Sequence, residues 1–378
     1  MLKRILLGLA STLLVIWVLY VIMANKDRHI ALPPTDTQFR AYNEVSRDSG
    51  RGNLIGIQPY MLSVDYSSEE AFFQKMNGYF AEARKKGWFN AKTIVVLPEN
   101  LGTWLVAMDE KRSVYTTRSI SEAMQILVYS NVFAFASARI QAPREIEDKA
   151  GYSIFAMKAP DMANTYQSVF SQLAQTYDVT IVAGSILLPS PAIVENKLVV
   201  GGGPLYSVCG IFKPDGSLSD LIQKAYPTES EKPLVAPGNL HNNPLIRTPA
   251  GNLAVIIGND SWASVAYADI HKKGANLVVV PAYEKLANSW LIPWHGYDGF
   301  PTPQDGRSSI DSLRVGQAWV KYTMPTRAPK EAAIQRGMTV FLKGELWNLS
   351  SDGLTLMLRD QPIEGTRIQA ATLSCLWL

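Results

Sequence analysis

The first strong hydrophobic pattern is an uncharged, mostly apolar run over residues 5–24. A helix of this length rises roughly 30 Å, at about 1.5 Å per residue, and so matches the hydrocarbon core of a bilayer. A cleaved signal peptide has a shorter apolar region and a small-residue cleavage site, and residues 22–27 offer a poor one. We therefore predict a membrane anchor over residues 1–25, with a signal peptide as the alternative.

The charges that flank this run predict its orientation. Lys3 and Arg4 precede it, whereas Lys26 and Arg28 follow it beside an aspartate. This bias favours the N-terminus in the cytoplasm. We expect a single-pass protein of the cell membrane with the bulk of the chain outside the cytoplasm, in the periplasm if the source is bacterial. Residues 26–50 contain prolines, glycines and charges without apolar periodicity, which predicts a tether.

From residue 51 onward, short apolar runs typical of buried strands alternate with amphipathic stretches typical of helices. The alternation of strand and helix predicts an α/β fold with parallel β-α-β units. The predicted strands include 54–62, 93–100, 180–188, 253–258 and 276–282, and the predicted helices include 67–87, 165–178 and 264–274.

One long apolar and aromatic segment, residues 120–140, interrupts this alternation. Polar residues such as Glu122 and Asn131 lie within it, and a second membrane span would have to bury them. Two interpretations remain open: a core helix, which we favour, and a helix in the membrane interface. The segment belongs to an apolar insertion that we expect within about 105–160, and it is where we expect a protein partner.

Composition and charge narrow the function further. Hydrophobic residues make up 47% of the 378 residues, enough for a sizeable core. The net charge of +3 arises from 36 basic and 33 acidic residues without long like-charge runs, which argues against nucleic acid binding. Cys209 and Cys375 are too few for a disulfide framework, and no cysteine or histidine spacing suits zinc. We predict no metal and no cofactor.

Three segments carry candidate chemistry. The strand over 93–100 ends on Pro-Glu-Asn and so delivers Glu99 at its carboxyl end, where α/β folds present catalytic groups. Lys224 opens a Lys-x-x-Pro-Thr-x-x-Glu sequence that ends at Glu231. The strand over 253–258 ends on a Gly-Asn-Asp elbow that begins at Gly258.

Together these segments resemble the carbon-nitrogen hydrolase (nitrilase) superfamily over about residues 52–360. The stretch 330–358 also resembles a signature found in the nitrilase-like domain of apolipoprotein N-acyltransferases. The resemblance implies a four-layer α-β-β-α sandwich over 51–360, preceded by one transmembrane helix. Residues 361–378 form a C-terminal tail without a recognisable motif.

The resemblance also implies roles for individual residues. Glu99 takes the place of the general base, Lys224 that of the oxyanion-stabilising lysine, and Glu231 that of the second glutamate. The family's cysteine nucleophile is missing, because alignment places Gly258 at its position. We therefore predict a degenerate hydrolase that binds a small amide, ester or acyl ligand or serves a structural role. The alternative is an active amide hydrolase or N-acyltransferase that uses Ser261 or a water activated at Glu99.

Overall fold

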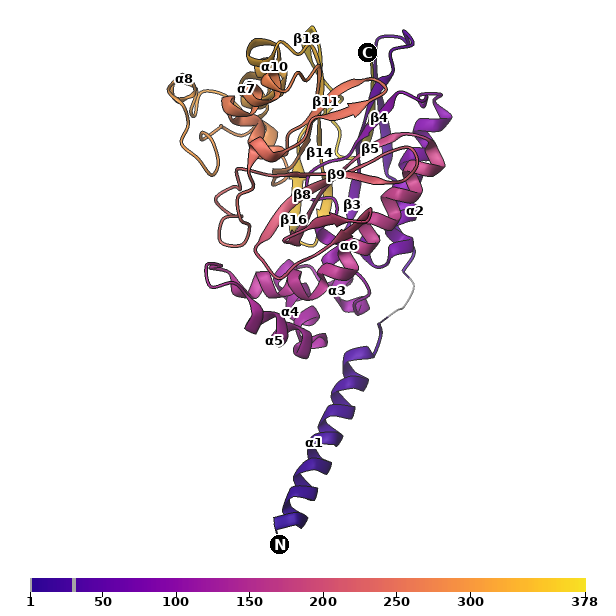
Figure 1. Cartoon of the computed structure of the whole chain (residues 1–378), viewed down its shortest axis with the longest axis vertical. Coiled ribbons are helices and arrows are strands. Elements are labelled where there is room, and N and C mark those ends of the chain that lie inside the picture. The colour runs from indigo at the N-terminus through magenta and orange to yellow at the C-terminus, as the bar shows by residue number, and fades with distance from the viewer. Residues whose placement is uncertain (1, 29–31) are drawn as a thin grey trace.

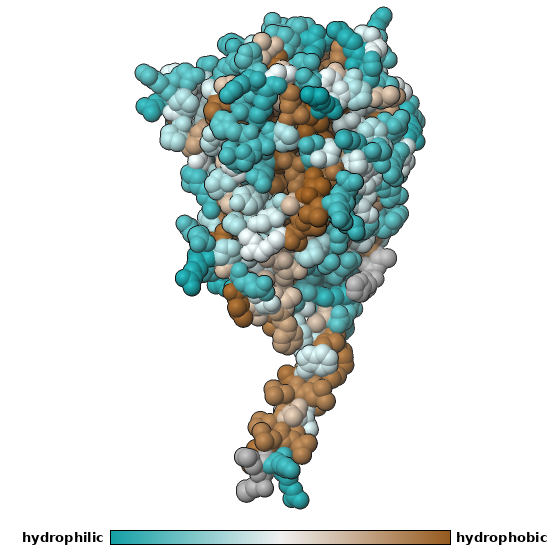
Figure 2. Space-filling view, viewed as in Figure 1, coloured by the Kyte–Doolittle hydropathy of each residue, from teal (hydrophilic) through white to brown (hydrophobic). Residues whose placement is uncertain are grey.

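The computed structural model describes residues 2–28 and 32–378 and places one long helix outside a layered body (Figure 1). This helix, α1 (Leu2–Asn25), is the one described helix that is long and apolar enough to cross a membrane. Hydrophobic side chains cover most of its length (Figure 2). The helix therefore matches the predicted anchor in position and character.

Two large sheets form the centre of the body. Each contains a parallel core, β2-β4-β5 in the first sheet and β11-β12-β14 in the second. The first has the order β1 (Phe39–Val45), β19 (Ala371–Trp377), β2 (Asn53–Gln58), β4 (Thr93–Val96), β5 (Thr180–Pro189), β8 (Leu205–Phe212) and β9 (Leu218–Gln223). The second has the order β10 (Ile246–Thr248), β11 (Gly251–Val255), β12 (Leu277–Ala282), β14 (Arg336–Phe341), β17 (Leu356–Arg359) and β18 (Gln361–Glu364).

The sheets pack face to face and helices cover their outer faces. Between the sheets, side chains such as Val96 from the first and Val279 from the second share one buried cluster. α2 (Glu69–Lys85) and α6 (Lys149–Tyr177) pack on the first sheet, and α7 (Ser264–Lys272), α9 (Val315–Tyr322) and α10 (Met324–Ala332) on the second. This is the predicted four-layer α-β-β-α sandwich.

Smaller elements complete the body around one end of the sheets. A four-stranded sheet has the order β13 (Glu284–Lys285), β16 (Leu349–Asp352), β15 (Lys343–Leu346) and β3 (Tyr60–Leu62), and a hairpin contains β6 (Ala192–Val194) and β7 (Lys197–Val199). The remaining α-helices are α3 (Arg112–Thr116), α4 (Ile120–Ser130), α5 (Val132–Gln141) and α8 (Gln304–Arg307). Figure 1 places α4 and α5 at the end of the body that faces α1.

The predicted tether and C-terminal tail are wrong in part. Within the tether, 39–45 forms β1, and within the tail, 371–377 forms β19, which lies between β1 and β2. The backbone N–H and the hydroxyl of Thr35 both donate to the buried carboxylate of Asp65, each at 2.8 Å. The chain between anchor and body is thus attached to the body over much of its length; residues 29–31 lie outside the described residues.

The 120–140 segment also differs from our favoured interpretation. It forms two helices, α4 and α5, that meet at Asn131, whose ψ of 33° breaks the helical backbone. Leu127 is buried, but Tyr129 and Phe133 expose 64% and 62% of their surface. A single core helix is therefore wrong, and the apolar character of the segment requires another explanation.

Candidate active site

The elbow after β11 is a sharp turn built on Gly258. The parallel strand β11 continues through Ile257 into a short 3-10 helix, Gly258–Trp262. Gly258 has φ of +43°, a left-handed conformation that residues with a side chain rarely adopt. The local fold therefore favours glycine at the position where the family resemblance implies a cysteine.

Glu99 approaches this elbow from the other sheet. It follows β4, and the turn that carries it is held by Ser185 of β5, whose hydroxyl accepts a hydrogen bond from the Asn100 N–H at 2.8 Å. Its side chain is only 3% exposed. A Cβ atom built on Gly258 would lie 2.1 Å from the Oε2 atom of Glu99. The carboxylate is thus directed at the position from which a nucleophilic side chain would extend.

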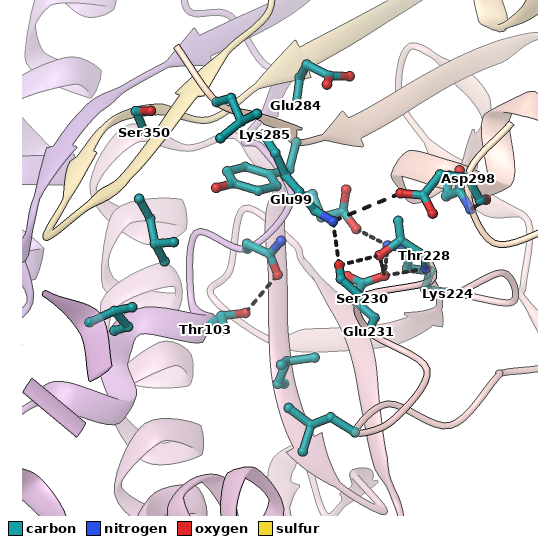
Figure 3. A pocket seen from close by; sticks show the side chains of 18 of the residues that line it. Glu99, Thr103, Lys224, Thr228, Ser230, Glu231, Glu284, Lys285, Asp298 and Ser350 are labelled. Carbon is teal, nitrogen blue, oxygen red and sulfur yellow. Dashed lines mark hydrogen bonds and ion pairs between the residues drawn. The ribbon is translucent and has the colours of Figure 1, made fainter. Parts of the chain in front are cut away.

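Lys224, which follows β9, joins two carboxylates at the same point (Figure 3). Its Nζ atom donates to Glu99 Oε1 at 2.7 Å and to Glu231 Oε2 at 2.6 Å. The same Glu231 oxygen also accepts from the Thr228 N–H at 2.7 Å and from the Thr228 hydroxyl at 3.0 Å. The structure therefore brings together Glu99, Lys224, Glu231 and Gly258, the residues to which the family resemblance assigns roles.

Burial and mutual charge set the protonation of this cluster. Burial opposes the charge on Lys224, but the adjacent Glu99 and Glu231 carboxylates outweigh it and raise the pKa of the ammonium. Burial raises the pKa of Glu99 despite the opposing effect of Lys224. For Glu231, burial is outweighed by Lys224 and by hydrogen bonds from Thr228, so its pKa is lowered. The lysine stays charged, and Glu99 is the more basic of the two carboxylates.

These groups lie in a cavity of about 620 Å³. One wall is aromatic: Trp262 lies 5.8 Å from Trp294, with the rings stacked, and 4.9 Å from Trp319 between ring centroids. Met124 of α4 and Phe155 of α6 also line the cavity. The cavity therefore offers a small charged centre within a largely apolar enclosure.

Comparison with known proteins agrees with this geometry. A model of the carbon-nitrogen hydrolase family matches residues 54–297. The chain belongs to the carbon-nitrogen hydrolase family. No curated protein sequence matches it.

Solved structures show the same fold. The amidase from Nesterenkonia sp. has 14% identity to this chain and a TM-score of 0.51, with 88% of this chain and 92% of the amidase covered. A variant from Nesterenkonia sp. AN1 carries acrylamide at its active-site cysteine (13% identity, TM-score 0.51, 86% and 93% covered). Another, in complex with butyramide, has 13% identity and a TM-score of 0.50, with 85% and 89% covered. At these identities the likeness concerns the fold alone.

Two residues of this carbon-nitrogen hydrolase elbow attach it to the Lys224 segment. The buried Asp260 carboxylate accepts from the Ala225 N–H at 2.8 Å and the Tyr226 N–H at 2.7 Å. Burial raises the pKa of Asp260 to about 7, against the effect of these bonds. The Asn259 side chain donates to the Tyr226 carbonyl at 3.1 Å. The pair fixes the distance between the lysine and the elbow.

Ser261 is poorly placed to act as a nucleophile. It is fully buried, does not line the cavity, and donates its hydroxyl hydrogen to the Gly258 carbonyl at 2.7 Å. It is not a helix N-cap either, because α7 begins after Ala263. Its hydroxyl instead stabilises the 3-10 turn of the elbow.

Sequence reasoning missed two charged residues of the cavity, Glu284 and Lys285. Burial raises the pKa of Glu284 to about 7, although its Oε2 atom accepts a hydrogen bond from Trp319 Nε1 at 2.9 Å. Lys285 lies across the cavity near Glu99 and donates to the Ser230 hydroxyl, with its Nζ 4.0 Å from Asp298 Oδ2 (Figure 3). Both follow the parallel strand β12, so their position at a carboxyl strand end was the available signal.

The loop over 283–303 contributes to both the cavity and the core. Of the aromatics that the sequence places there, Trp294 lines the cavity, whereas Trp290 packs against Phe341 at 5.3 Å between ring centroids.

Within residues 2–28 and 32–378, no group of three or more histidine, cysteine or acidic side chains is arranged to hold a metal ion.

Proposed function

We propose that this chain is a membrane-anchored carbon-nitrogen hydrolase homologue that binds a carbonyl ligand but lacks nucleophilic catalysis. The observation that carries this proposal is the position of Gly258, which lies at the elbow facing Glu99, has no thiol, and would bring an added Cβ atom to 2.1 Å from Glu99 Oε2. A base and an ammonium remain with no nucleophile between them. The site is therefore a degenerate active site that serves as a binding module.

The chemistry of the cavity favours an amide, ester or acyl ligand. The Lys224 ammonium can stabilise a carbonyl oxygen, and Glu99 Oε2, which accepts no hydrogen bond from any described residue, can accept one from an amide N–H. The surrounding Trp104, Met124 and Phe155 favour a ligand with a hydrocarbon part. Acrylamide and butyramide bound to the related amidase have this composition.

The absence of a nucleophile favours a binding function over catalysis, because a nucleophile contributes a large part of the rate of such enzymes. In a serine protease, removal of the nucleophile lowers turnover by about a millionfold, and a remnant rate survives from the oxyanion hole and binding. A loss of the same size at position 258 would leave an amidase with only the remnant rate that binding and the Lys224 ammonium provide. Retained Lys224 and Glu231 still provide the charged centre that holds a ligand.

The test combines binding and turnover on the full-length protein. Butyramide is titrated calorimetrically and ammonia release is measured in the same samples, with wild type, Glu99→Gln and Glu229→Gln compared. Glu229 is the control because its side chain is 69% exposed. We expect binding without turnover, weakened only in Glu99→Gln. Turnover by the wild type at a rate typical of enzymes would contradict the proposal.

A second candidate is hydrolysis by a water activated at Glu99. The raised pKa of Glu99 favours it, because a carboxylate with a pKa nearer neutrality is a better general base. This mechanism predicts slow turnover that disappears in Glu99→Gln and persists in Ser261→Ala. Turnover that disappears in Ser261→Ala would instead identify the serine as the nucleophile.

We further propose that α1 spans a cell membrane and that the body lies outside the cytoplasm. The support is the uncharged run over 5–24 and the basic residues Lys3 and Arg4 that precede it. The protein should then require detergent for extraction and retain its N-terminal residues. Mass spectrometry of the mature protein tests this, and an N-terminus near residue 25 would identify a cleaved signal peptide.

A further inference from the structure

α5 and the end of α4 present large apolar side chains to solvent. Tyr129, Phe133 and Ile140 expose 64%, 62% and 85% of their surface, and Val132 exposes 39%. The described residues leave this surface largely exposed, and clusters of exposed apolar residues mark interaction sites. The question is what covers this surface.

The surface is continuous with the end of the candidate span. The Tyr20 ring of α1 packs edge-on against Phe133 at 5.2 Å between centroids, and the Tyr20 hydroxyl accepts a hydrogen bond from the Val132 N–H at 3.0 Å. Tyr20 lies four residues before Ala24, where the uncharged run ends. This corresponds to about 6 Å along a helix, which places the contact at the edge of the hydrocarbon core.

Polar contacts hold the body against α1 in this position. The Arg28 guanidinium donates to Glu110 Oε2 at 3.0 Å and to the Asn131 side chain at 2.9 Å. The Lys111 ammonium donates to the Met23 carbonyl at 2.6 Å. Because Asn131 is the junction of α4 and α5, these bonds fix the two helices relative to the span.

From this geometry we infer that α4 and α5 (Ile120–Gln141) lie in the outer interface of the phospholipid bilayer, as a second membrane attachment. The inference rests on the proposal that α1 spans the membrane. Interfacial helices insert their apolar face about 5–10 Å, a depth that agrees with the contact at Tyr20. The exposed Arg139 and Arg144 flank this face and can pair with lipid phosphates.

A bilayer explains the surface better than a protein partner does. If α1 crosses a membrane, the bilayer itself lies beside Phe133, so no additional component is needed to cover the surface. The arrangement also orients the cavity, because Ile120 and Met124 of α4 form part of its wall. Interfacial insertion would therefore place that wall close to the lipid.

The test is lipid quenching of fluorescent labels on the full-length protein in phosphatidylcholine nanodiscs. Phe133→Cys and Ile140→Cys are labelled with a thiol-reactive fluorophore, and doxyl-labelled phospholipid is added as the quencher. The native Cys209 and Cys375 are fully buried and should not react. Unchanged thermal unfolding of each variant would show that it is folded.

Two further label positions provide the controls. Leu13→Cys lies within α1, whereas Val265→Cys is an exposed apolar position on α7, on the opposite side of the body from α1 (Figure 1). We expect loss of fluorescence at 13, 133 and 140 and none at 265. Quenching at 13 alone would overturn the interfacial attachment and leave the span intact, and would favour a protein partner on this surface. Absence of quenching at 13 would overturn the span and the attachment together.

Discussion

The Glu99 Oε2 atom lies 2.1 Å from the point that a Cβ atom would occupy on Gly258. Real Cβ atoms essentially never come within 3.0 Å of another heavy atom in this way. The carboxylate therefore occupies the volume that the first carbon of a nucleophilic residue needs. Glycine here is part of the arrangement of the site, because restoring a side chain requires Glu99 to move as well.

Restoring the thiol with Gly258→Cys should give little activity. The new side chain must adopt a left-handed φ, which costs on the order of 1–3 kcal/mol, and must displace the Glu99 carboxylate. We expect a lower free energy of unfolding and weak ammonia release from small amides. Denaturant titration and a turnover assay measure the two effects.

Gly258→Ala is the matched control, since it adds the same Cβ atom without a thiol. Its free energy of unfolding should fall by the same amount as that of Gly258→Cys, and it should gain no turnover. The double variant Gly258→Cys with Glu99→Gln should lose any ammonia release that Gly258→Cys gains. If Gly258→Ala were as stable as the wild type, the steric relationship between Glu99 and residue 258 would be wrong.

The buried cluster around Lys224 should depend strongly on its one ammonium. Lys224→Met leaves Glu99 and Glu231 without their shared cation, and removal of one partner from a buried ion pair costs about 3–5 kcal/mol. We expect a large loss of stability and of amide binding. Lys232→Met, which alters a lysine with a side chain 47% exposed, should change stability by less than about 1 kcal/mol.

A small effect of Lys224→Met would need a different explanation of the cluster. Protonation of both carboxylates could compensate for the missing charge, and it would appear as a stability that falls with rising pH. A variant that is stable at every pH and still binds amides would show that Lys224 does not hold the ligand.

Much of the fold was accessible from sequence because its strands are buried and its helices have clear ends. Ser68 illustrates this, since its hydroxyl accepts from the Ala71 N–H at 3.1 Å and α2 begins directly after it, within the helix predicted over 67–87. The edge pair formed by 39–45 and 371–377 was missed because its two segments are more than 300 residues apart. No local pattern indicates which distant segment a strand will join.

The candidate site shows the same division. Glu99, Lys224 and Glu231 could be assigned to the site because their segments resemble motifs of the carbon-nitrogen hydrolase family. Glu284 was missed because its role depends on burial against Trp319, a contact that chain order alone does not reveal. Sequence also left Ser261 open as a nucleophile, whereas its distance of 2.7 Å to the Gly258 carbonyl is a property of the folded turn.

Glu284 should make stability depend on pH. Burial raises its pKa from 4.5 to about 7, so the folded protein retains a proton that the unfolded chain releases. That contribution is complete below pH 4.5 and is lost as the pH rises toward about 7. At about 1.4 kcal/mol per pKa unit, a shift of this size contributes roughly 3 kcal/mol to the free energy of unfolding.

Replacing Glu284 by glutamine tests this dependence. Glu284→Gln keeps an oxygen for Trp319 Nε1 but cannot ionise, so its free energy of unfolding should fall less between pH 5 and pH 8 than that of the wild type. Glu229→Gln, at an exposed position, should follow the wild-type curve. Parallel curves for wild type and Glu284→Gln would show that the folded protein does not raise this pKa.

Ser261→Ala should affect stability and leave ligand binding unchanged. It removes the hydrogen bond to the Gly258 carbonyl, a loss of about 0.5–1.5 kcal/mol. Ser230→Ala, at an exposed serine that lines the cavity, is the comparison. Calorimetric titration with butyramide and a turnover assay are carried out on both serine variants and on the wild type. If the wild type turned over amides and Ser261→Ala did not, Ser261 would be the nucleophile.

The boundary of the folded body can be tested by two truncations. A chain that begins at Pro34 lacks α1 but keeps Thr35, which donates to Asp65, and the whole of β1. A chain that begins at Ser46 loses both. β19 then becomes an edge strand with unpaired backbone groups, which promotes aggregation.

We expect the longer truncated chain to be soluble without detergent and the shorter one to aggregate or unfold at lower denaturant concentration. The shorter chain should lose more stability than removal of β1 alone would cost, because it also lacks Thr35. The Thr35 hydroxyl accepts a hydrogen bond from Lys75 at 2.6 Å, and Lys75 is fully buried with Asp65. Size-exclusion chromatography and urea titration measure both properties. Equal solubility and stability of the two chains would mean that residues 34–45 act as a tether after all.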